Sequence, residues 1–119
     1  MSVQPIGVAV AGLGFGEKVH LPALEACSDL CSAALWHPRR QRLDEACLAH
    51  GLVGYDDWNA LLNDPSVEAV VIATPPAPRF ELARRALEAG KHLFLEKPVA
   101  LSADQAKELQ RLAIAHGLS

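Results

Sequence analysis

The sequence predicts an α/β fold, a doubly wound parallel sheet between two helical layers (three-layer αβα). Short apolar runs alternate with amphipathic segments along all 119 residues. The apolar runs are continuous, which is typical of strands that are covered on both faces in a parallel sheet. A helical pattern follows each run, as expected for right-handed crossovers between parallel strands.

Five strands are expected, each an apolar or β-favouring run that ends at a turn. They cover residues 6–11, 32–36, 54–55, 69–73 and 92–95. The clearest is 69–73, with the sequence AVVIA. The chain stops at Ser119, directly after a helical pattern, so we expect five strands to be present and a sixth to be truncated.

The first two helices are marked by proline and glycine. The first follows the glycine-rich turn, continues to about Cys27, and is interrupted or restarted at Pro22. Pro38 suits the start of the second helix, and Gly51 suits its end. Its expected apolar face carries Leu43, Ala46, Cys47 and His50.

Capping residues and apolar stripes mark the remaining helices. Asp56 or Asp57 can cap a short helix around Trp58. A stripe of Phe80, Ala83 and Leu87 indicates the next helix, which Gly90 closes. The last helix begins with a capping box formed by Ser102 and Gln105 and ends at Gly117.

Composition excludes several classes of protein. A net charge of −3 with scattered basic residues argues against a nucleic-acid partner. No segment is long and apolar enough to span a bilayer, and the N-terminus lacks the positive region of a signal peptide, so we expect a cytoplasmic protein with no membrane contact. The three cysteines form no CxxC pair or metal-ligand spacing, so we expect small buried side chains in a reducing compartment and no metal site.

The turn after the first strand has the sequence Gly12-Leu-Gly14-Phe-Gly16-Glu17. In a βαβ unit such a turn favours dinucleotide binding, since Gly12 allows a tight turn and Gly14 a close approach of the pyrophosphate to backbone N–H groups. The third glycine of G-x-G-x-x-G falls at Glu17, which we expect to loosen the packing of helix on strand. An ordinary strand-to-helix turn, or the G-x-G-x-G of methyltransferases that bind S-adenosylmethionine, remains an alternative.

The end of the second strand distinguishes NADP from NAD. A carboxylate there would accept hydrogen bonds from the ribose 2′-hydroxyl of NAD. The sequence instead has Trp36, His37, Pro38, Arg39 and Arg40. Because Arg suits bidentate contact with phosphate, we favour NADP over NAD, with His37, Arg39 or Arg40 on the 2′-phosphate and Trp36 beside the adenosine ribose. A solvated basic helix start is the alternative.

Two further segments, Ala73-Thr-Pro-Pro76 and Gly90-Lys-His-Leu-Phe-Leu-Glu-Lys-Pro98, complete a recognisable set. Together with the turn at Gly12–Gly16 and with His20-Leu-Pro22, they resemble the Gfo/Idh/MocA oxidoreductases, the family of glucose–fructose oxidoreductase and inositol dehydrogenase. The resemblance covers essentially the whole chain. It implies that residues 1–119 form the NAD(P)-binding Rossmann domain, and that a C-terminal domain for substrate binding and oligomerisation is absent.

The resemblance also implies roles for individual residues. The cofactor would lie against Gly12, Gly14, Phe15, Gly16, Thr74, Pro75, Glu96, Lys97 and Pro98. Lys97 would be the catalytic residue, projecting toward nicotinamide and substrate, and Pro98 would follow a cis peptide. Arg79 stands where the family often has His. Contact with the edge of the cofactor or substrate is one interpretation of Arg79, and we favour a solvated helix start over it. We expect His20 to be structural and His92 to be packed in a buried strand.

The function expected is hydride transfer between a nicotinamide cofactor and a sugar, cyclitol or related hydroxy compound. The remaining acid–base residues would belong to the absent domain, so this chain alone is expected to bind cofactor without turnover, and the full-length protein to be a homo-oligomer. A non-catalytic NAD(P)-sensing module is one alternative, and a methyltransferase-like domain is another.

Overall fold

A computed structural model describes residues 4–119 and confirms the expected parallel sheet. Its five strands lie in the order β3-β2-β1-β4-β5, all parallel. They are β1 (Ile6–Ala11), β2 (Leu30–Trp36), β3 (Val53–Tyr55), β4 (Ala69–Ile72) and β5 (His92–Leu95). The order changes direction at β1, because the chain moves outward to β3 and then returns to the other side of β1 as β4. This topological switch point is where α/β sheets of this type bind ligands.

A helical segment follows every strand. These segments are η1 (Gly16–His20), a π-helix that continues into α1 (Leu21–Glu25), and then α2 (Arg40–His50), α3 (Trp58–Leu62), α4 (Pro76–Glu88) and α5 (Ala103–Ala115). The predicted restart at Pro22 is confirmed, since α1 begins with this proline in its first turn. Two predicted caps are also present: the Asp57 side chain accepts from the Asn59 N–H, and the Ser102 side chain accepts from the Gln105 N–H.

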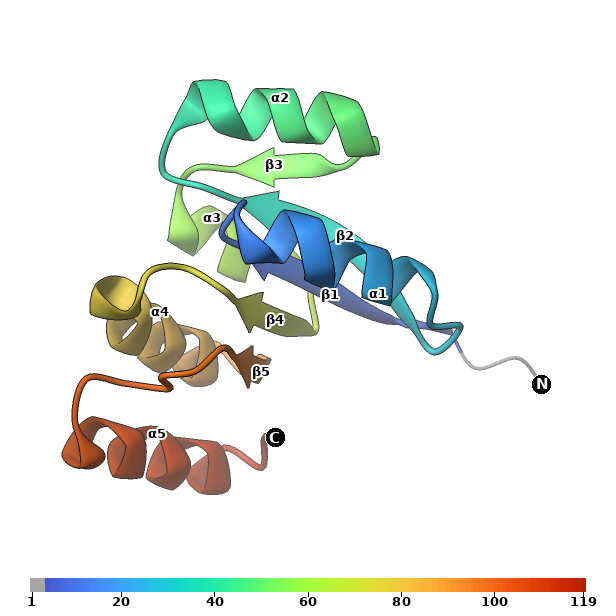
Figure 1. The fold of residues 1–119 in the computed structure, drawn as a ribbon. Helices are drawn as coiled ribbons and strands as arrows, with labels where there is room; N and C mark the ends of the chain where they lie inside the picture. Colours follow the sequence, from blue (N-terminus) through green and yellow to red (C-terminus); the bar gives the residue numbers. More distant parts are fainter. Residues whose placement is uncertain (1–3) are drawn as a thin grey trace.

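The helices form the two expected outer layers. In Figure 1, α1 and α2 lie on one side of the sheet, and α3 and α4 lie on the other, with α5 beside α4. Alternate residues of β1 face the two layers: Val8 and Val10 pack with α1 and α2, while Ala9 and Ala11 belong to the cluster formed with α3, α4 and α5. The sheet therefore divides the core into two halves.

Three expectations about local structure are wrong. Helix α2 begins at Arg40 rather than Pro38, because Arg39 is extended and caps it. His92 is exposed, since β5 is the edge strand of the described sheet; its Nδ1 accepts from the Ser119 N–H at 3.1 Å. The cysteines are not buried: Cys31 is exposed at the start of β2, and Cys27 and Cys47 are half-buried.

Residues 4–119 contain neither a candidate membrane span nor a candidate metal cluster. None of the helices there is both long enough and apolar enough to cross a membrane. Within the same range, no group of three or more His, Cys, Asp or Glu side chains is arranged to hold a metal ion.

Candidate cofactor-binding site

The carboxyl ends of the central strands border one cleft. The cleft has a volume of about 810 Å³, and its lining residues come from the loops after β1, β2 and β4. They are Gly12, Leu13, Gly14, Trp36, His37, Pro38, Arg39, Ala73, Thr74, Pro75 and Pro78. In Figure 1 these loops lie on the left, where the arrowheads of the central strands point. The structure therefore brings three separately predicted segments together at the switch point.

The three glycines of the turn after β1 differ in what a side chain would meet at each position. Gly12 has φ 100°, and a Cβ on it would lie 2.7 Å from the Ala73 main-chain oxygen, so a side chain would be strained and would collide with the β4 loop. A Cβ on Gly16 would lie 2.7 Å from Val10 Cγ1. Gly14 is exposed and has no atom within 4 Å of the position of a Cβ. The space above Gly14 is thus open to a ligand.

The expectation that Glu17 loosens the packing at this turn is wrong. Gly16, one position earlier, is the residue that allows η1 to approach β1 closely. The Glu17 side chain instead points toward α2, where its carboxylate accepts from Arg42 and lies 3.0 Å from His50 Nε2. Hydrogen bonding from Arg42 is the main reason that the pKa of Glu17 is lowered.

Arg42 is a residue of this site that sequence reasoning missed. Its guanidinium donates to Glu17 and, at 3.0 Å, to the main-chain oxygen of Leu13 in the glycine turn. Helix α2 is therefore fastened directly to the turn. The spacing of Arg42 and His50, two helical turns apart on one face, was a signal that could have indicated a shared acidic partner.

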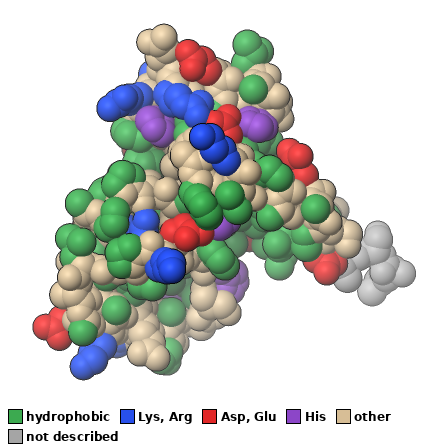
Figure 2. Space-filling view, in the orientation of Figure 1, with side chains coloured by type: hydrophobic (Ala, Val, Ile, Leu, Met, Phe, Trp, Pro, Cys, Tyr) green, Lys and Arg blue, Asp and Glu red, His purple; other side chains and the backbone are tan. Residues whose placement is uncertain are grey.

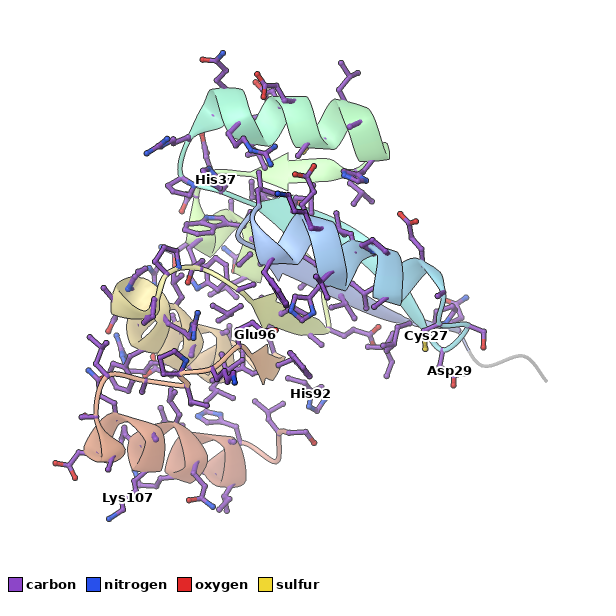
Figure 3. All side chains as sticks on the ribbon, viewed as in Figure 1. Cys27, Asp29, His37, His92, Glu96 and Lys107 are labelled. Atoms are coloured by element: carbon purple, nitrogen blue, oxygen red, sulfur yellow. The ribbon has the colours of Figure 1, made fainter. Side chains whose placement is uncertain are left out.

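The loop after β2 places two of its three predicted phosphate ligands at the cleft. His37 and Arg39 line it, and the Arg39 N–H donates to His37 Nδ1 at 3.0 Å. Burial lowers the pKa of His37, which Figure 3 labels at the start of this loop. Arg39 is exposed and forms no ion pair within residues 4–119. Its guanidinium is therefore available to an anion.

Arg40 is oriented differently. Its guanidinium lies 3.0 Å from Asp44 and 3.7 Å from Asp56, and it does not line the cleft. Figure 2 shows basic side chains gathered at the upper left beside a His, over the first turn of α2 in the view of Figure 1. Within this basic group, Arg39 rather than Arg40 is the side chain that borders the cleft.

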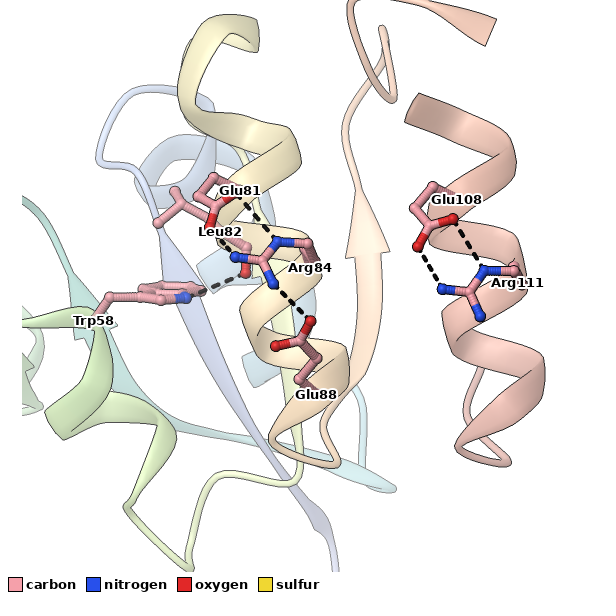
Figure 4. Close-up of polar contacts among 7 residues, drawn as sticks. All are labelled: Trp58, Glu81, Leu82, Arg84, Glu88, Glu108 and Arg111. Carbon is pink, nitrogen blue, oxygen red and sulfur yellow. Dashed lines mark hydrogen bonds and ion pairs between the residues drawn. The ribbon is translucent and has the colours of Figure 1, made fainter. Parts of the chain in front are cut away.

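Trp36 forms part of the floor of the cleft. Its ring meets the Trp58 ring edge to face, with centroids 5.1 Å apart. Trp58 Nε1 donates to the Leu82 main-chain oxygen at 3.2 Å, which fixes the second ring (Figure 4). Trp36 Nε1 is buried and has no acceptor among the described residues.

The loop after β4 is held by Arg79, and the expectation of a solvated Arg79 is wrong. This side chain is buried, with 3% exposure, and its guanidinium donates to the main-chain oxygens of Thr74, Glu96 and Pro98. Desolvation lowers its pKa. Arg79 thereby joins the Thr74-Pro75 loop to the Glu96-Lys97-Pro98 segment.

The segment after β5 is also held from the opposite side. Glu96 Oε1 lies 2.7 Å from His20 Nε2, and the His20 ring makes edge contacts with Phe15 and Phe94. Figure 3 labels Glu96 close to the end of β5. The peptide between Lys97 and Pro98 is cis, as the resemblance implied, and the Lys97 side chain is exposed, with no ion pair among residues 4–119. Arg79 holds the main chain of this segment, and His20 holds its Glu96 side chain, which leaves Lys97 as a cationic group without an ion pair among residues 4–119.

The combination of glycine turn, β4 loop and Glu-Lys-Pro segment matches a known family over nearly the whole chain. The sequence model described as "Oxidoreductase family, NAD-binding Rossmann fold" matches residues 6–119. The chain belongs to the Gfo/Idh/MocA oxidoreductase family. It is the NAD(P)-binding Rossmann domain of such an oxidoreductase, and this membership favours a nicotinamide dinucleotide over the S-adenosylmethionine alternative.

Similar proteins agree with this membership. An uncharacterized oxidoreductase from Synechocystis sp. is 40% identical over 107 residues, which are 89% of this chain and 29% of that protein. Levoglucosan dehydrogenase from Pseudarthrobacter phenanthrenivorans is 33% identical over 116 residues, covering 90% of this chain and 30% of the relative. The crystal structure of KijD10, a 3-ketoreductase from Actinomadura kijaniata in complex with NADP and TDP-benzene, has a TM-score of 0.90 at 34% identity and covers 96% and 35% of the two chains. The present chain thus spans about a third of the length of these proteins.

Proposed function

We propose that this chain is the cofactor-binding domain of an NADP-dependent dehydrogenase or reductase acting on a sugar, cyclitol or related hydroxy compound. The observation that carries the proposal is the cleft that joins Gly14, Arg39 and Thr74. Its glycine turn leaves room for phosphates, and its only lining arginine within residues 4–119 is Arg39, which forms no ion pair there. Among the described residues, none of those that line the cleft beside Arg39 is an Asp or Glu, whose carboxylate would repel a 2′-phosphate.

The residues around the cleft divide the work of binding. Gly12, Gly14 and Phe15 would accept the pyrophosphate side of the cofactor, with Gly16 holding the turn against β1. His37 and Arg39 would contact the 2′-phosphate, and Trp36 would lie beside the adenosine ribose. Thr74 and Pro75 would contact the nicotinamide ribose, and Glu96, Lys97 and Pro98 would border the nicotinamide end.

Within this chain, Lys97 would be the residue that assists hydride transfer by contacting the substrate. The bound cofactor supplies the carbon that accepts or donates hydride. The Lys97 ammonium group can donate a hydrogen bond to the oxygen on the reacting substrate carbon, which stabilises charge that develops there as an alcohol becomes a carbonyl or the reverse. Its freedom from ion pairs leaves its three donors available, while Arg79 holds the adjoining main-chain oxygens.

The substrate class is supported by the names of similar proteins. One similar protein is a levoglucosan dehydrogenase, and another is a 3-ketoreductase whose crystal structure contains NADP and TDP-benzene. We propose that the longer protein has a second domain that supplies further acid–base residues and forms a homo-oligomer, and that this chain alone binds cofactor without turnover.

The test is a titration of the purified chain with NADPH and with NADH, followed by tryptophan emission. Trp36 lines the cleft, so its emission is expected to change on binding. NADPH should bind more tightly than NADH, by roughly tenfold or more, because one charge-assisted phosphate contact contributes about 1.5–3 kcal/mol.

Arg39→Ala and Arg40→Ala form a matched pair of variants on neighbouring residues. Arg39→Ala should remove most of the preference for NADPH, whereas Arg40→Ala should have a smaller effect because Arg40 faces Asp44 and Asp56. A wild-type preference for NADH would overturn the assignment of NADP. Failure of the folded chain to bind either cofactor would overturn the proposed site.

A further inference from the structure

We propose that Arg42 is a positioning residue for the cofactor phosphates, and that it acts by neutralising Glu17 beside the glycine turn. Glu17 occupies the position where the usual dinucleotide fingerprint has its third glycine, and a carboxylate there is unfavourable for a site that accepts a pyrophosphate. The inference rests on the proposed cofactor site and adds to it the neutralisation of Glu17 by Arg42.

The geometry ties both residues to the turn. Glu17 directly follows Gly16, which packs against Val10 and cannot move away without opening that contact. Arg42, from the first turn of α2, donates to the Glu17 carboxylate and to the Leu13 main-chain oxygen at 3.0 Å. Leu13 lies between Gly12 and Gly14 and itself lines the cleft. One guanidinium therefore fixes the turn and balances the charge next to it.

The surroundings of Glu17 make its neutralisation depend on Arg42. The Glu17 side chain is 19% exposed, so water screens it only in part, and the Arg42 side chain is 37% exposed. His50 Nε2 lies 3.0 Å from the other carboxylate oxygen. Among the described residues, Arg42 is the sole Lys or Arg paired with Glu17. Without it, a carboxylate would remain at the edge of an anion site.

A double-mutant cycle of charge-neutralising substitutions tests this role by measuring the dissociation constant of NADPH for four proteins. They are the wild-type chain, Arg42→Met, Glu17→Gln and the double variant. Arg42→Met should weaken binding by roughly fivefold to tenfold, because a partly screened charge at this distance contributes about 1 kcal/mol. Adding Glu17→Gln should restore binding to within about threefold of wild type, since both the cation and the anion are then gone.

The rescue separates an electrostatic role from a structural one. If Arg42 only supported the fold, removing its partner Glu17 as well would leave binding as weak as in Arg42→Met, and that result would overturn the proposal. Arg42→Lys keeps the charge and should bind NADPH nearly as well as wild type. Arg42→Lys also provides a test if Arg42→Met does not fold. The proposal would then be contradicted if folded Arg42→Lys bound NADPH weakly while Glu17→Gln bound it as tightly as wild type.

A matched control comes from the Arg111–Glu108 pair on α5, which Figure 4 shows away from the cleft loops. Arg111→Met and Glu108→Gln change the net charge by the same amounts and should leave the dissociation constant unaltered. Raising the ionic strength should shrink the loss in Arg42→Met. If the wild-type chain binds neither cofactor, the proposed function fails and this inference fails with it. If the wild type binds but the cycle shows no rescue, the inference alone fails.

Discussion

The guanidinium of Arg79 donates a hydrogen bond to the main-chain oxygen of Pro98, nineteen residues further along the chain. The same side chain donates to Thr74 and Glu96, so one cation joins the loops after β4 and β5. In the proposed site, both loops would border the nicotinamide end of the cofactor. The position of Lys97 therefore depends on a buried arginine that does not itself line the cleft.

Replacing Arg79 with Met should destabilise the fold. The variant leaves the main-chain oxygens of Thr74, Glu96 and Pro98 without their donor in a buried environment, and we expect a loss of about 2–4 kcal/mol in the free energy of unfolding. Denaturant unfolding followed by circular dichroism measures this. Arg84→Met is the control on the same helix, since Arg84 pairs at the surface with Glu81 and Glu88 (Figure 4). This substitution should lower the free energy of unfolding far less. Equal stability of the two variants would contradict the assigned role of Arg79.

Arg79 also shows where sequence reasoning stops. The strands could be predicted because continuous apolar runs such as AVVIA have few alternatives, and the turn at Gly12 could be located because it ends the first run. The burial of Arg79 could not be predicted, since its acceptors are main-chain oxygens, which carry no side-chain signal in a sequence. The hydrogen bond from Arg42 to Leu13 could not be predicted for the same reason, because its acceptor is also a main-chain oxygen. Arg39 and Arg40 are adjacent and chemically identical, and only the structure distinguishes them, because Arg39 lines the cleft while Arg40 pairs with Asp44 and Asp56.

Alanine at the two later glycines of the turn should affect different properties: stability at Gly16 and NADPH binding at Gly14. Gly16→Ala places a Cβ 2.7 Å from Val10 Cγ1 and should cost roughly 1–3 kcal/mol of stability through overpacking. Gly14→Ala enters open space and should leave stability within about 0.5 kcal/mol of wild type. Because we place the pyrophosphate against Gly14, this second variant should nevertheless bind NADPH at least tenfold more weakly. Thermal unfolding and an NADPH titration on both variants measure the two effects, and normal NADPH binding by Gly14→Ala would move the phosphates elsewhere.

The cysteines should react with a thiol reagent in the order of their exposure. Cys31 is exposed, whereas Cys47 is half-buried and burial raises the pKa of its thiol. Since the thiolate is the reactive form, Cys47 should be alkylated more slowly at pH 8. Mass spectrometry after a short exposure to iodoacetamide should find the label mainly on Cys31. Faster labelling of Cys47 would mean that α2 separates from β3, where Cys47 packs against Gly54.

The Glu17 network should make a defined contribution to stability at acid pH. Hydrogen bonding from Arg42 holds the pKa of Glu17 below its ordinary value, so the folded state binds this proton less readily than the unfolded state does. The stabilisation is therefore complete above the unfolded pKa, about 4.3, and is lost as the pH falls through the lower folded value. Glu17→Gln should be less stable than wild type by about 1 kcal/mol at pH 7, a figure kept small by the partial exposure of Arg42.

The difference between wild type and Glu17→Gln should then shrink as the pH falls from about 4.3 through the lower folded pKa of Glu17, because the wild-type carboxyl takes up its proton over that range. Comparing the two proteins isolates Glu17 from other carboxyls with a lowered pKa, such as Asp64, which are the same in both. Glu45→Gln removes an exposed carboxylate from α2 that forms no ion pair within residues 4–119, and it serves as the control. Denaturant unfolding at pH 7, 5, 4 and 3 measures the profile. A difference that grew toward low pH would show that the Glu17 carboxylate is unfavourable in the folded state, and that Arg42 does not balance it.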